Sequence, residues 1–128
     1  MEVEMQVPPM MMTPRMKLHE GEEVLHKTDA FRRKGALGNL HGQIYVTNER
    51  VAFVKAIMKS GLISWAADKM GFKPKVEFPL AALARVETQD HKEGPRLLLA
   101  DVSREETFVV GELDDLIALI NSTRASAG

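Results

Sequence analysis

The chain has 128 residues, of which 45% are hydrophobic and 27% charged, and its formal net charge is −1. This composition is that of one soluble globular domain, and the absence of cysteine excludes disulfides, thiolate metal sites and a cysteine nucleophile. No apolar run approaches the ~20 residues that a membrane-spanning helix needs, and the acidic N-terminus does not resemble a secretory signal. We therefore expect a soluble, cytoplasmic protein.

The charges are distributed unevenly along the chain. Residues 27–75 contain ten Lys or Arg and three acidic residues, whereas the remainder contains seven basic and fifteen acidic residues. This division creates a charged face if the fold keeps the two parts apart, and the charges average out if the fold interleaves them. The sequence alone leaves both outcomes open.

The first 17 residues hold six of the eight methionines and three of the six prolines. Pro8, Pro9 and Pro14 interrupt any helical or strand periodicity. We expect residues 1–17 to form a disordered or loosely docked tail and the domain proper to span residues 18–125. A Met-rich tail can also adhere to an apolar groove.

Seven short strands are predicted after this tail. Their expected ranges are residues 22–31, 40–46, 51–57, 76–80, 83–88, 96–102 and 107–110. Turn signals separate most of them at intervals of about 8–12 residues, a pattern typical of an all-β sandwich or barrel. Pro79 in the fourth strand indicates an edge strand or a bend.

A helix is predicted after Gly111, where the apolar period changes from two to 3.6 residues. Its apolar stripe consists of Leu113, Leu116, Ile117 and Ile120. Acidic residues crowd its first turn, where the helix dipole favours anions. The expected fold is mainly β: a seven-stranded, bent antiparallel sheet or partly open barrel, capped by one C-terminal helix that covers the open end.

Three segments of the sequence occur in a characteristic order. Glu20-Gly21-Glu22 precedes GQIYVTNERVAF at residues 42–53, and FPLAALARV follows at residues 78–86. This order resembles the GRAM family of the pleckstrin-homology-like (PH-like) superfamily over about residues 18–123. The resemblance implies a PH-like fold and a non-enzymatic binding module, since some members of the superfamily bind phosphorylated lipid (phosphoinositide) headgroups.

The tip of the predicted hairpin carries Thr47, Asn48 and Arg50. Asn48 suits the left-handed conformation of a tight turn and can bond nearby backbone, while Thr47 can bond the turn from the other side. Arg50 has donors for exposed carbonyl groups. We expect these residues to lock the register of the hairpin, and ligand binding by Thr47 and Arg50 is the alternative.

The sequence gives little sign of catalytic chemistry. The histidines have no metal-ligand spacing and are His19, His26, His41 and His91. With a loop over residues 32–39, His26 falls opposite Tyr45, whereas a tight turn at residues 33–34 would place it opposite His41. No phosphate-binding glycine loop or paired nucleophile and base is found. We expect no enzymatic activity, metal or cofactor, and no nucleic-acid partner, because the basic segment lacks stacking aromatics.

A basic loop is predicted between the first two strands, at Arg32, Arg33 and Lys34. In lipid-binding PH domains this loop supplies the cations that hold a phosphorylated headgroup, and three clustered cations beside a glycine suit an anion. We therefore hypothesise recruitment to an anionic membrane surface. The alternative is a solvated loop.

Residues 58–73 form an insert between the third and fourth predicted strands. It contains Leu62, Ile63 and the chain's only tryptophan, Trp65, which are candidate membrane or partner anchors. Lysines surround this insert, and the candidate headgroup ligands among them are Lys55, Lys59, Lys69 and Lys73. Alternatively the insert packs inward, or it or a strand edge docks a protein partner. The oligomeric state stays open.

Overall fold

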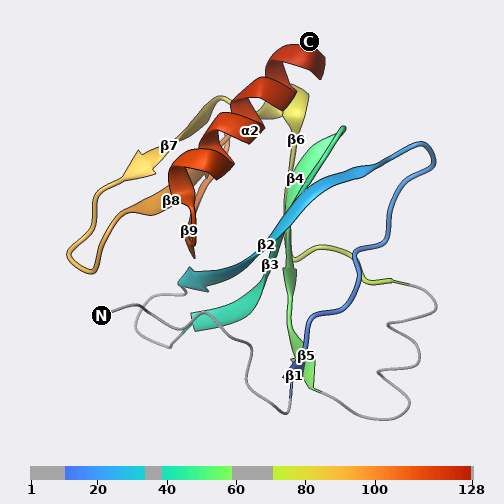
Figure 1. Ribbon diagram of the computed structural model, residues 1–128, viewed down its shortest axis with the longest axis horizontal. Helices are drawn as coiled ribbons and strands as arrows, with labels where there is room; N and C mark the ends of the chain where they lie inside the picture. Colours follow the sequence, from blue (N-terminus) through green and yellow to red (C-terminus); the bar gives the residue numbers. More distant parts are fainter. Residues whose placement is uncertain (1–10, 34–38, 59–70, 128) are drawn as a thin grey trace.

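A computed structural model describes residues 11–33, 39–58 and 71–127, and it confirms the mainly β fold class. Seven strands form one open antiparallel sheet in the order β6-β4-β3-β2-β9-β8-β7 (Figure 1). They are β2 (Val24–Arg33), β3 (Asn39–Thr47), β4 (Arg50–Lys55), β6 (Val76–Pro79), β7 (Arg85–Gln89), β8 (Arg96–Ala100) and β9 (Glu105–Val110). As Pro79 indicated, β6 is an edge strand, and β7 forms the other edge.

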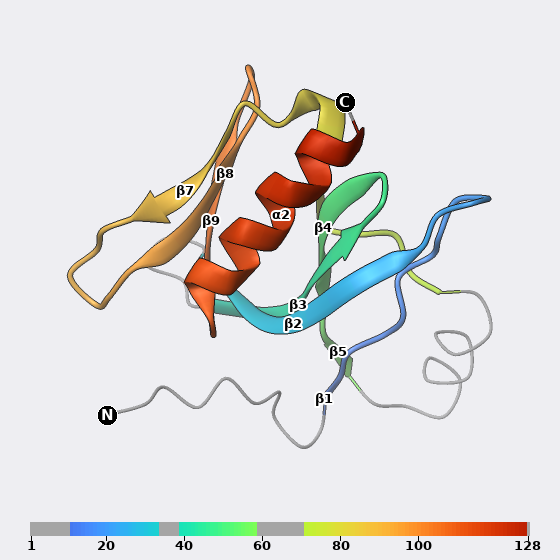
Figure 2. The same ribbon diagram turned by 45° about the horizontal axis from the view of Figure 1, so that its top comes forward.

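The C-terminal helix α2 (Leu113–Ala127) lies along the concave side of the bent sheet (Figure 2). It contacts β7, β8 and the 3-10 turn η2 (Leu80–Ala82), so it covers the open end between the two edge strands. The predicted stripe is confirmed: Leu116 and Ile120 are buried, and Leu113 and Ile117 pack against the core. Within the described residues no helix is long and apolar enough to cross a membrane.

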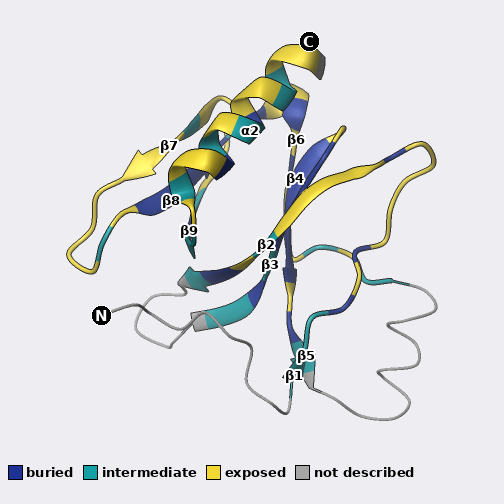
Figure 3. Cartoon of the chain, in the orientation of Figure 1, coloured by how far each residue is buried: buried dark blue, intermediate teal, exposed yellow. Residues whose placement is uncertain are grey.

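The main core lies between the inner face of the sheet and α2. Strand alternation places every second residue of β3 and β4 on this side, including Ile44, Val46 and Phe53, all fully buried. Phe53 packs against Phe108 of β9 with ring centroids 5.3 Å apart. The exposed residues of α2 lie on the opposite side of the helix from this core (Figure 3).

A second, smaller cluster lies on the outer face of the same strands. Tyr45, Ala52 and Val54 alternate with the inner residues and are covered by the buried side chain of Met16. This is why β4 is buried along nearly its whole length. Residues 13–18, here termed the strap, supply that cover.

Two short elements lie at the start of the strap. β1 (Met11–Met12) pairs antiparallel with β5 (Ile57–Met58), so the expected third strand ends at Lys55 and a separate short strand follows. Met16 then forms a parallel bridge with Phe72. The Lys17 N–H donates to the Phe72 carbonyl at 2.9 Å, and the Phe72 N–H donates to the Arg15 carbonyl at 2.8 Å.

Residues 11–17 of the expected tail are therefore packed on the sheet in the structure, because the apolar side chain of Met16 covers the apolar outer residues of β3 and β4. Residues 1–10 of that tail lie outside the described residues.

The register between β2 and β3 differs by one residue from the predicted one. Lys27 lies opposite Tyr45, and His26 lies opposite Val46 rather than opposite Tyr45 or His41. The strands extend to a closing pair at Arg33 and Asn39, so their connection is shorter than the predicted loop. A one-residue shift exchanges the two faces, and it places Lys27 beside Tyr45 on the outer face.

Candidate binding site

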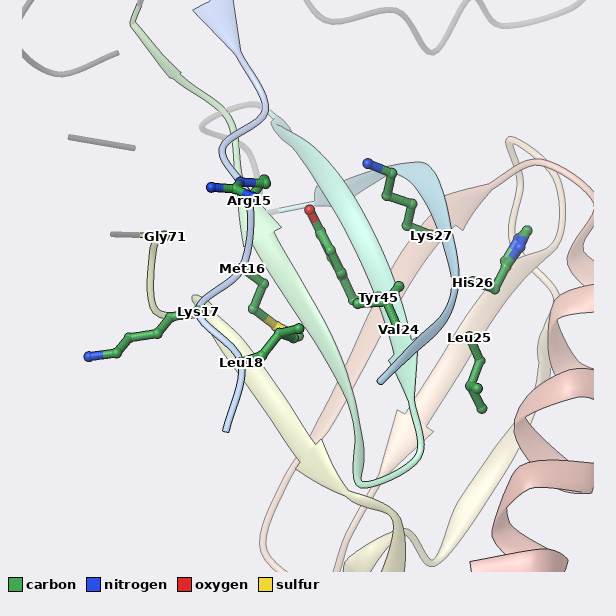
Figure 4. A pocket seen from close by; sticks show the side chains of 10 residues that line it. All are labelled: Arg15, Met16, Lys17, Leu18, Val24, Leu25, His26, Lys27, Tyr45 and Gly71. Carbon is green, nitrogen blue, oxygen red and sulfur yellow. The ribbon is translucent and has the colours of Figure 1, made fainter. Parts of the chain in front are cut away.

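A groove of about 560 Å³ lies between the strap and the first residues of β2 (Figure 4). It forms because the strap covers Ala52, Val54 and most of Tyr45, which is 4% exposed, but does not reach the first residues of β2. Its lining residues are Arg15, Met16, Lys17, Leu18, Val24, Leu25, His26, Lys27, Tyr45 and Gly71. No Asp or Glu occurs among these lining residues of the described chain.

The polar end of the groove is basic. In Figure 4 the Tyr45 hydroxyl points toward the end at which Arg15 and Lys27 lie, whereas the Lys17 side chain points away from the groove. Burial raises the pKa of Tyr45, so its hydroxyl stays protonated at neutral pH and can donate a hydrogen bond. Among the described residues Lys27 has no ion-pair partner, so its ammonium group is available to an anion.

The other end of the groove is apolar. Four large apolar side chains are strongly exposed in the described part of the chain, and three of them line this groove. Leu18 is 42% exposed, Val24 38% and Leu25 47%. Leu18 and Val24 lie beside Met16 at the base of the Tyr45 ring, while Leu25 points toward α2 (Figure 4). Leu18 and Val24 therefore form a small apolar surface, exposed to water, beside the basic end of the groove.

A buried ion pair at the hairpin tip also holds the end of the strap. The Arg50 Nε and Nη2 atoms donate to the two carboxylate oxygens of Glu22 at 2.8 and 2.9 Å. Nη2 also donates to the Lys17 carbonyl at 2.8 Å, and Nη1 donates to Glu77. We call Glu22 and Arg50 the clamp. All three guanidinium nitrogens of Arg50 are hydrogen-bonded within the protein. The sequence had instead predicted bonds from Arg50 to exposed carbonyls of the turn.

Glu22 is held ionised by this clamp. Its burial alone would raise its pKa, but hydrogen bonds from Arg50, the His19 N–H and Thr47, with the Arg50 charge, lower the pKa from 4.5 to about 2. The Thr47 hydroxyl donates to Glu22 at 2.7 Å. The charge of Glu22 is therefore permanent at physiological pH, and the clamp is structural.

Thr47 and Asn48 act at the hairpin tip in different ways. The Thr47 hydroxyl oxygen accepts the N–H groups of Glu49 and Arg50 at 3.1 and 3.0 Å, which closes the turn. Asn48 instead bonds the segment before β2, accepting the Glu23 N–H and donating to the Gly21 carbonyl. Among the described residues only Glu112 combines a side chain with a positive φ, so Asn48 does not use the left-handed conformation.

Three members of the basic loop and of the lysines around the insert are described, and Arg32, Lys55 and Lys73 do not line this groove. The Arg32 guanidinium binds the Glu106 carboxylate through two hydrogen bonds of 3.0 and 2.9 Å, with both side chains 18% exposed. Lys55 is exposed at the end of β4, opposite Gly42. Lys73 is exposed beside Lys17 in a neighbouring hollow.

Other predicted site residues lie outside the described part of the chain. They are the Arg33 side chain and Lys34, Lys59, Leu62, Ile63, Trp65 and Lys69. Conversely, the sequence did not point to Arg15, Leu18, Val24 or Lys27. The one sequence feature that indicated this site was the Met-rich tail, which was expected to adhere to apolar surface. Met16 makes such a contact in the structure.

A group with metal-ligand residue types lies beside the clamp. The His19 Nδ1 atom is 3.1 Å from Glu49 Oε1 and 3.7 Å from Glu22 Oε1. Both oxygens of Glu22 are already bound by the Arg50 guanidinium, so a cation here would face an existing positive charge. The donor set does not suit a metal ion.

No protein-family model matches the sequence, and a comparison with curated proteins finds no match. Among solved structures the chain is similar to the C-terminal domain of an unknown protein from Leishmania infantum. The TM-score is 0.54 and the identity 12%, over 83% of this chain and 87% of that one. Similarity at this identity concerns the fold alone.

Proposed function

We propose that the domain is a non-enzymatic binding module that docks on anionic membrane lipids, as its resemblance to GRAM domains suggests, and acts as a peripheral protein of the cytoplasm. The observation that carries this proposal is the groove between strap and β2. Its charged lining is entirely basic, and its rim exposes Leu18 and Val24 to water. Such a combination matches the chemistry of a membrane interface, where anionic headgroups lie above apolar chains.

The expected electrostatic contribution is modest for each residue and useful in sum. A Lys or Arg close to an anionic bilayer contributes on the order of 1 kcal/mol, which corresponds to roughly a fivefold change in affinity. Lys27 lies at the groove, and Lys17 and Lys73 lie together in the adjoining hollow. Because the net charge is only −1, this local arrangement and not the overall charge would attract the bilayer.

In this proposal Lys27 binds the lipid headgroup, the role that the sequence analysis expected of Arg32. Arg32 is engaged by Glu106, so its release to a headgroup would leave a carboxylate without its partner. Arg33, Lys34 and Trp65 remain candidates for further contacts with the bilayer, and they are tested separately below.

A protein partner is the alternative. β7 is an edge strand whose outer residues are largely exposed, and an extended peptide can add to such an edge. Its side chains are mostly polar, and Arg85 is already paired with Glu87 and Glu105, so this edge offers little apolar surface to a partner.

Co-sedimentation with vesicles tests the proposal. The wild type should bind vesicles containing phosphatidylserine in preference to neutral phosphatidylcholine vesicles, with an affinity that falls as salt is added. Lys17→Gln with Lys27→Gln should reduce binding roughly 30-fold, since two cations are removed. Lys92→Gln is the matched control, because Lys92 is exposed in the turn between β7 and β8, far from the strap (Figure 1).

Two further variants assign the contacts. Arg33→Gln with Lys34→Gln tests the basic loop without breaking the Arg32–Glu106 pair, and Trp65→Ala tests the insert. Equal binding to both kinds of vesicle would contradict the proposal. A loss confined to the loop or insert variants would move the contact away from the groove.

A further inference from the structure

We propose that the groove binds a single-chain anionic amphiphile as a monomer, with its charged head at Lys27 and Tyr45 and its hydrocarbon chain over Met16, Leu18 and Val24. This inference rests on the proposed function and names the ligand class of the same site. A carboxylate and a phosphate head share the required chemistry, which is a compact anion on one apolar chain.

The anionic head of the ligand would bind to the polar groups at the basic end of the groove. The Lys27 ammonium supplies charge, and the Tyr45 hydroxyl supplies a neutral donor that burial keeps protonated. That hydroxyl donates to the Pro14 carbonyl over 3.5 Å, a long and therefore weak bond, and the Met16 N–H lies against it from the strap. An anion that approached Tyr45 would offer the hydroxyl a stronger acceptor.

The hydrocarbon chain of the ligand would lie at the apolar end of the groove. Leu18 and Val24 lie on opposite walls of the groove, Leu18 on the strap beside Met16 and Val24 on β2 (Figure 4). Leu18 is 42% and Val24 38% exposed to water, whereas Met16 is buried beneath them. A hydrocarbon chain between the walls would remove that surface from water, whereas a compact anion would leave it exposed.

The size of the groove suits one small molecule. A volume of about 560 Å³ lies within the range of about 300–1,000 Å³ that small-molecule pockets occupy. The walls are also built in: the strap is fixed by backbone bonds to Phe72 and by the Arg50 bond to the Lys17 carbonyl. A pre-formed site of this kind binds a ligand without the entropic cost of first ordering the polypeptide.

Tyr45 makes a direct test possible, since it is the only tyrosine of the chain. The full chain is produced with 3-fluorotyrosine, and its single ¹⁹F resonance is followed during titration with sub-micellar decanoate. Decyl maltoside carries the same chain on a neutral head, and butyrate carries the same head on a short chain. Decanoate should shift the resonance saturably and bind at least tenfold more tightly than either control compound.

The variants separate the two ends of the groove. Lys27→Gln should weaken decanoate roughly fivefold and leave decyl maltoside unchanged. Leu18→Gln with Val24→Thr should weaken decanoate at least fivefold and leave butyrate unchanged. Lys92→Gln and Val102→Thr are matched controls, since both residues are exposed outside the groove and their loss should change nothing. Circular dichroism checks that each variant is folded.

The outcomes distinguish this inference from the membrane proposal. Decanoate binding that the groove variants weaken supports the inference, whether or not vesicles are bound. The inference is overturned if decanoate binds no more tightly than butyrate or than decyl maltoside. It is also overturned if the Leu18 and Val24 changes leave the affinity for decanoate unchanged. Normal preference for anionic vesicles without any decanoate response would also overturn it, while leaving the membrane proposal intact.

Discussion

The inner and outer faces of the same strands are covered in different ways. On the inner side of β3 and β4, side chains such as Ile44 and Phe53 are sealed under a 15-residue helix. On the outer side, the strap covers Tyr45, Ala52 and Val54 with the side chain of Met16, and only Pro14 and Met16 of the strap are buried. The outer cover is attached by a few backbone bonds and by the clamp.

With the proposed function, this difference assigns stability and binding to different faces of the sheet. The helix buries enough apolar surface to hold the sheet in its bent form, so the outer face is not required to be closed completely. A partial cover leaves apolar and basic groups exposed along its border, and that border is the groove. The inner face should therefore dominate stability, and the outer face should dominate binding.

The largest effect is expected from the inner face. Ile120→Ala removes a fully buried side chain between α2 and the sheet and should lower the free energy of unfolding by about 2–5 kcal/mol. Ile117→Ala, on the same helix but only partly buried, should cost clearly less. Urea denaturation of both variants measures the difference. An equal loss for the two residues would mean that α2 does not face the sheet as described.

The clamp should give the next largest effect, and it should depend on pH. Glu22 has a pKa of about 2 in the folded chain and about 4.5 when unfolded, so its contribution is complete above pH 4.5 and disappears as the pH falls toward 2. The shift corresponds to about 3 kcal/mol. Glu22→Gln should therefore destabilise the domain by roughly that amount at pH 7 and flatten the acid side of its stability profile.

Glu77→Gln is the matched control for the clamp. Glu77 also binds Arg50, but its side chain is 48% exposed, whereas that of Glu22 is fully buried. An exposed pair contributes at most about 1 kcal/mol. Unfolding midpoints measured from pH 2 to pH 7 compare the variants. A cost at Glu77 as large as at Glu22 would show that burial is not what makes the clamp strong.

The architecture could be predicted because it follows from periodic patterns. Alternation located seven strands, and the stripe from Leu113 to Ile120 located the helix and the side that it buries. The hairpin tip was recognised as structural from its residue types. The partner of Arg50 was not, because Glu22 lies 28 residues away in the sequence and no local pattern connects the two.

The candidate site could not be predicted for a related reason. Its walls are joined by tertiary contacts, since the strap meets Phe72 some 55 residues later and Lys27 reaches Tyr45 through the β2–β3 register. A one-residue error in that register moved His26 into the position that Lys27 occupies. Clusters of adjacent cations, such as Arg32 to Lys34, are easy to see in a sequence. Glu106, which binds Arg32, lies on the neighbouring strand β9 but 74 residues away in the sequence.

Gly42 of β3 provides a test of how closely β3 and β4 pack. A Cβ atom at this position would lie 2.2 Å from the Val54 carbonyl oxygen and 2.8 Å from two carbons of the Phe53 ring. Gly42→Ala should therefore push β3 away from β4 and cost about 1–3 kcal/mol, as overpacking does. Gly94→Ala is a useful comparison, since its Cβ would meet nothing and only its positive φ would cause strain. Thermal unfolding that ranks the two equally would contradict the close approach.

The smallest effect is expected at Asn48, which fixes the segment before β2 at the border of the two faces. Its side chain accepts the Glu23 N–H at 2.8 Å and donates to the Gly21 carbonyl at 3.3 Å. Both bonds are exposed, so water can replace them, and Asn48→Ala should cost only about 1 kcal/mol. Asn48→Asp keeps the acceptor for Glu23 and loses the donor to Gly21, so it should cost less than the alanine variant. Because neither bond involves the groove, both variants should bind anionic vesicles like the wild type. Reduced vesicle binding by a folded Asn48→Ala variant would show instead that the hairpin tip contributes to the binding site.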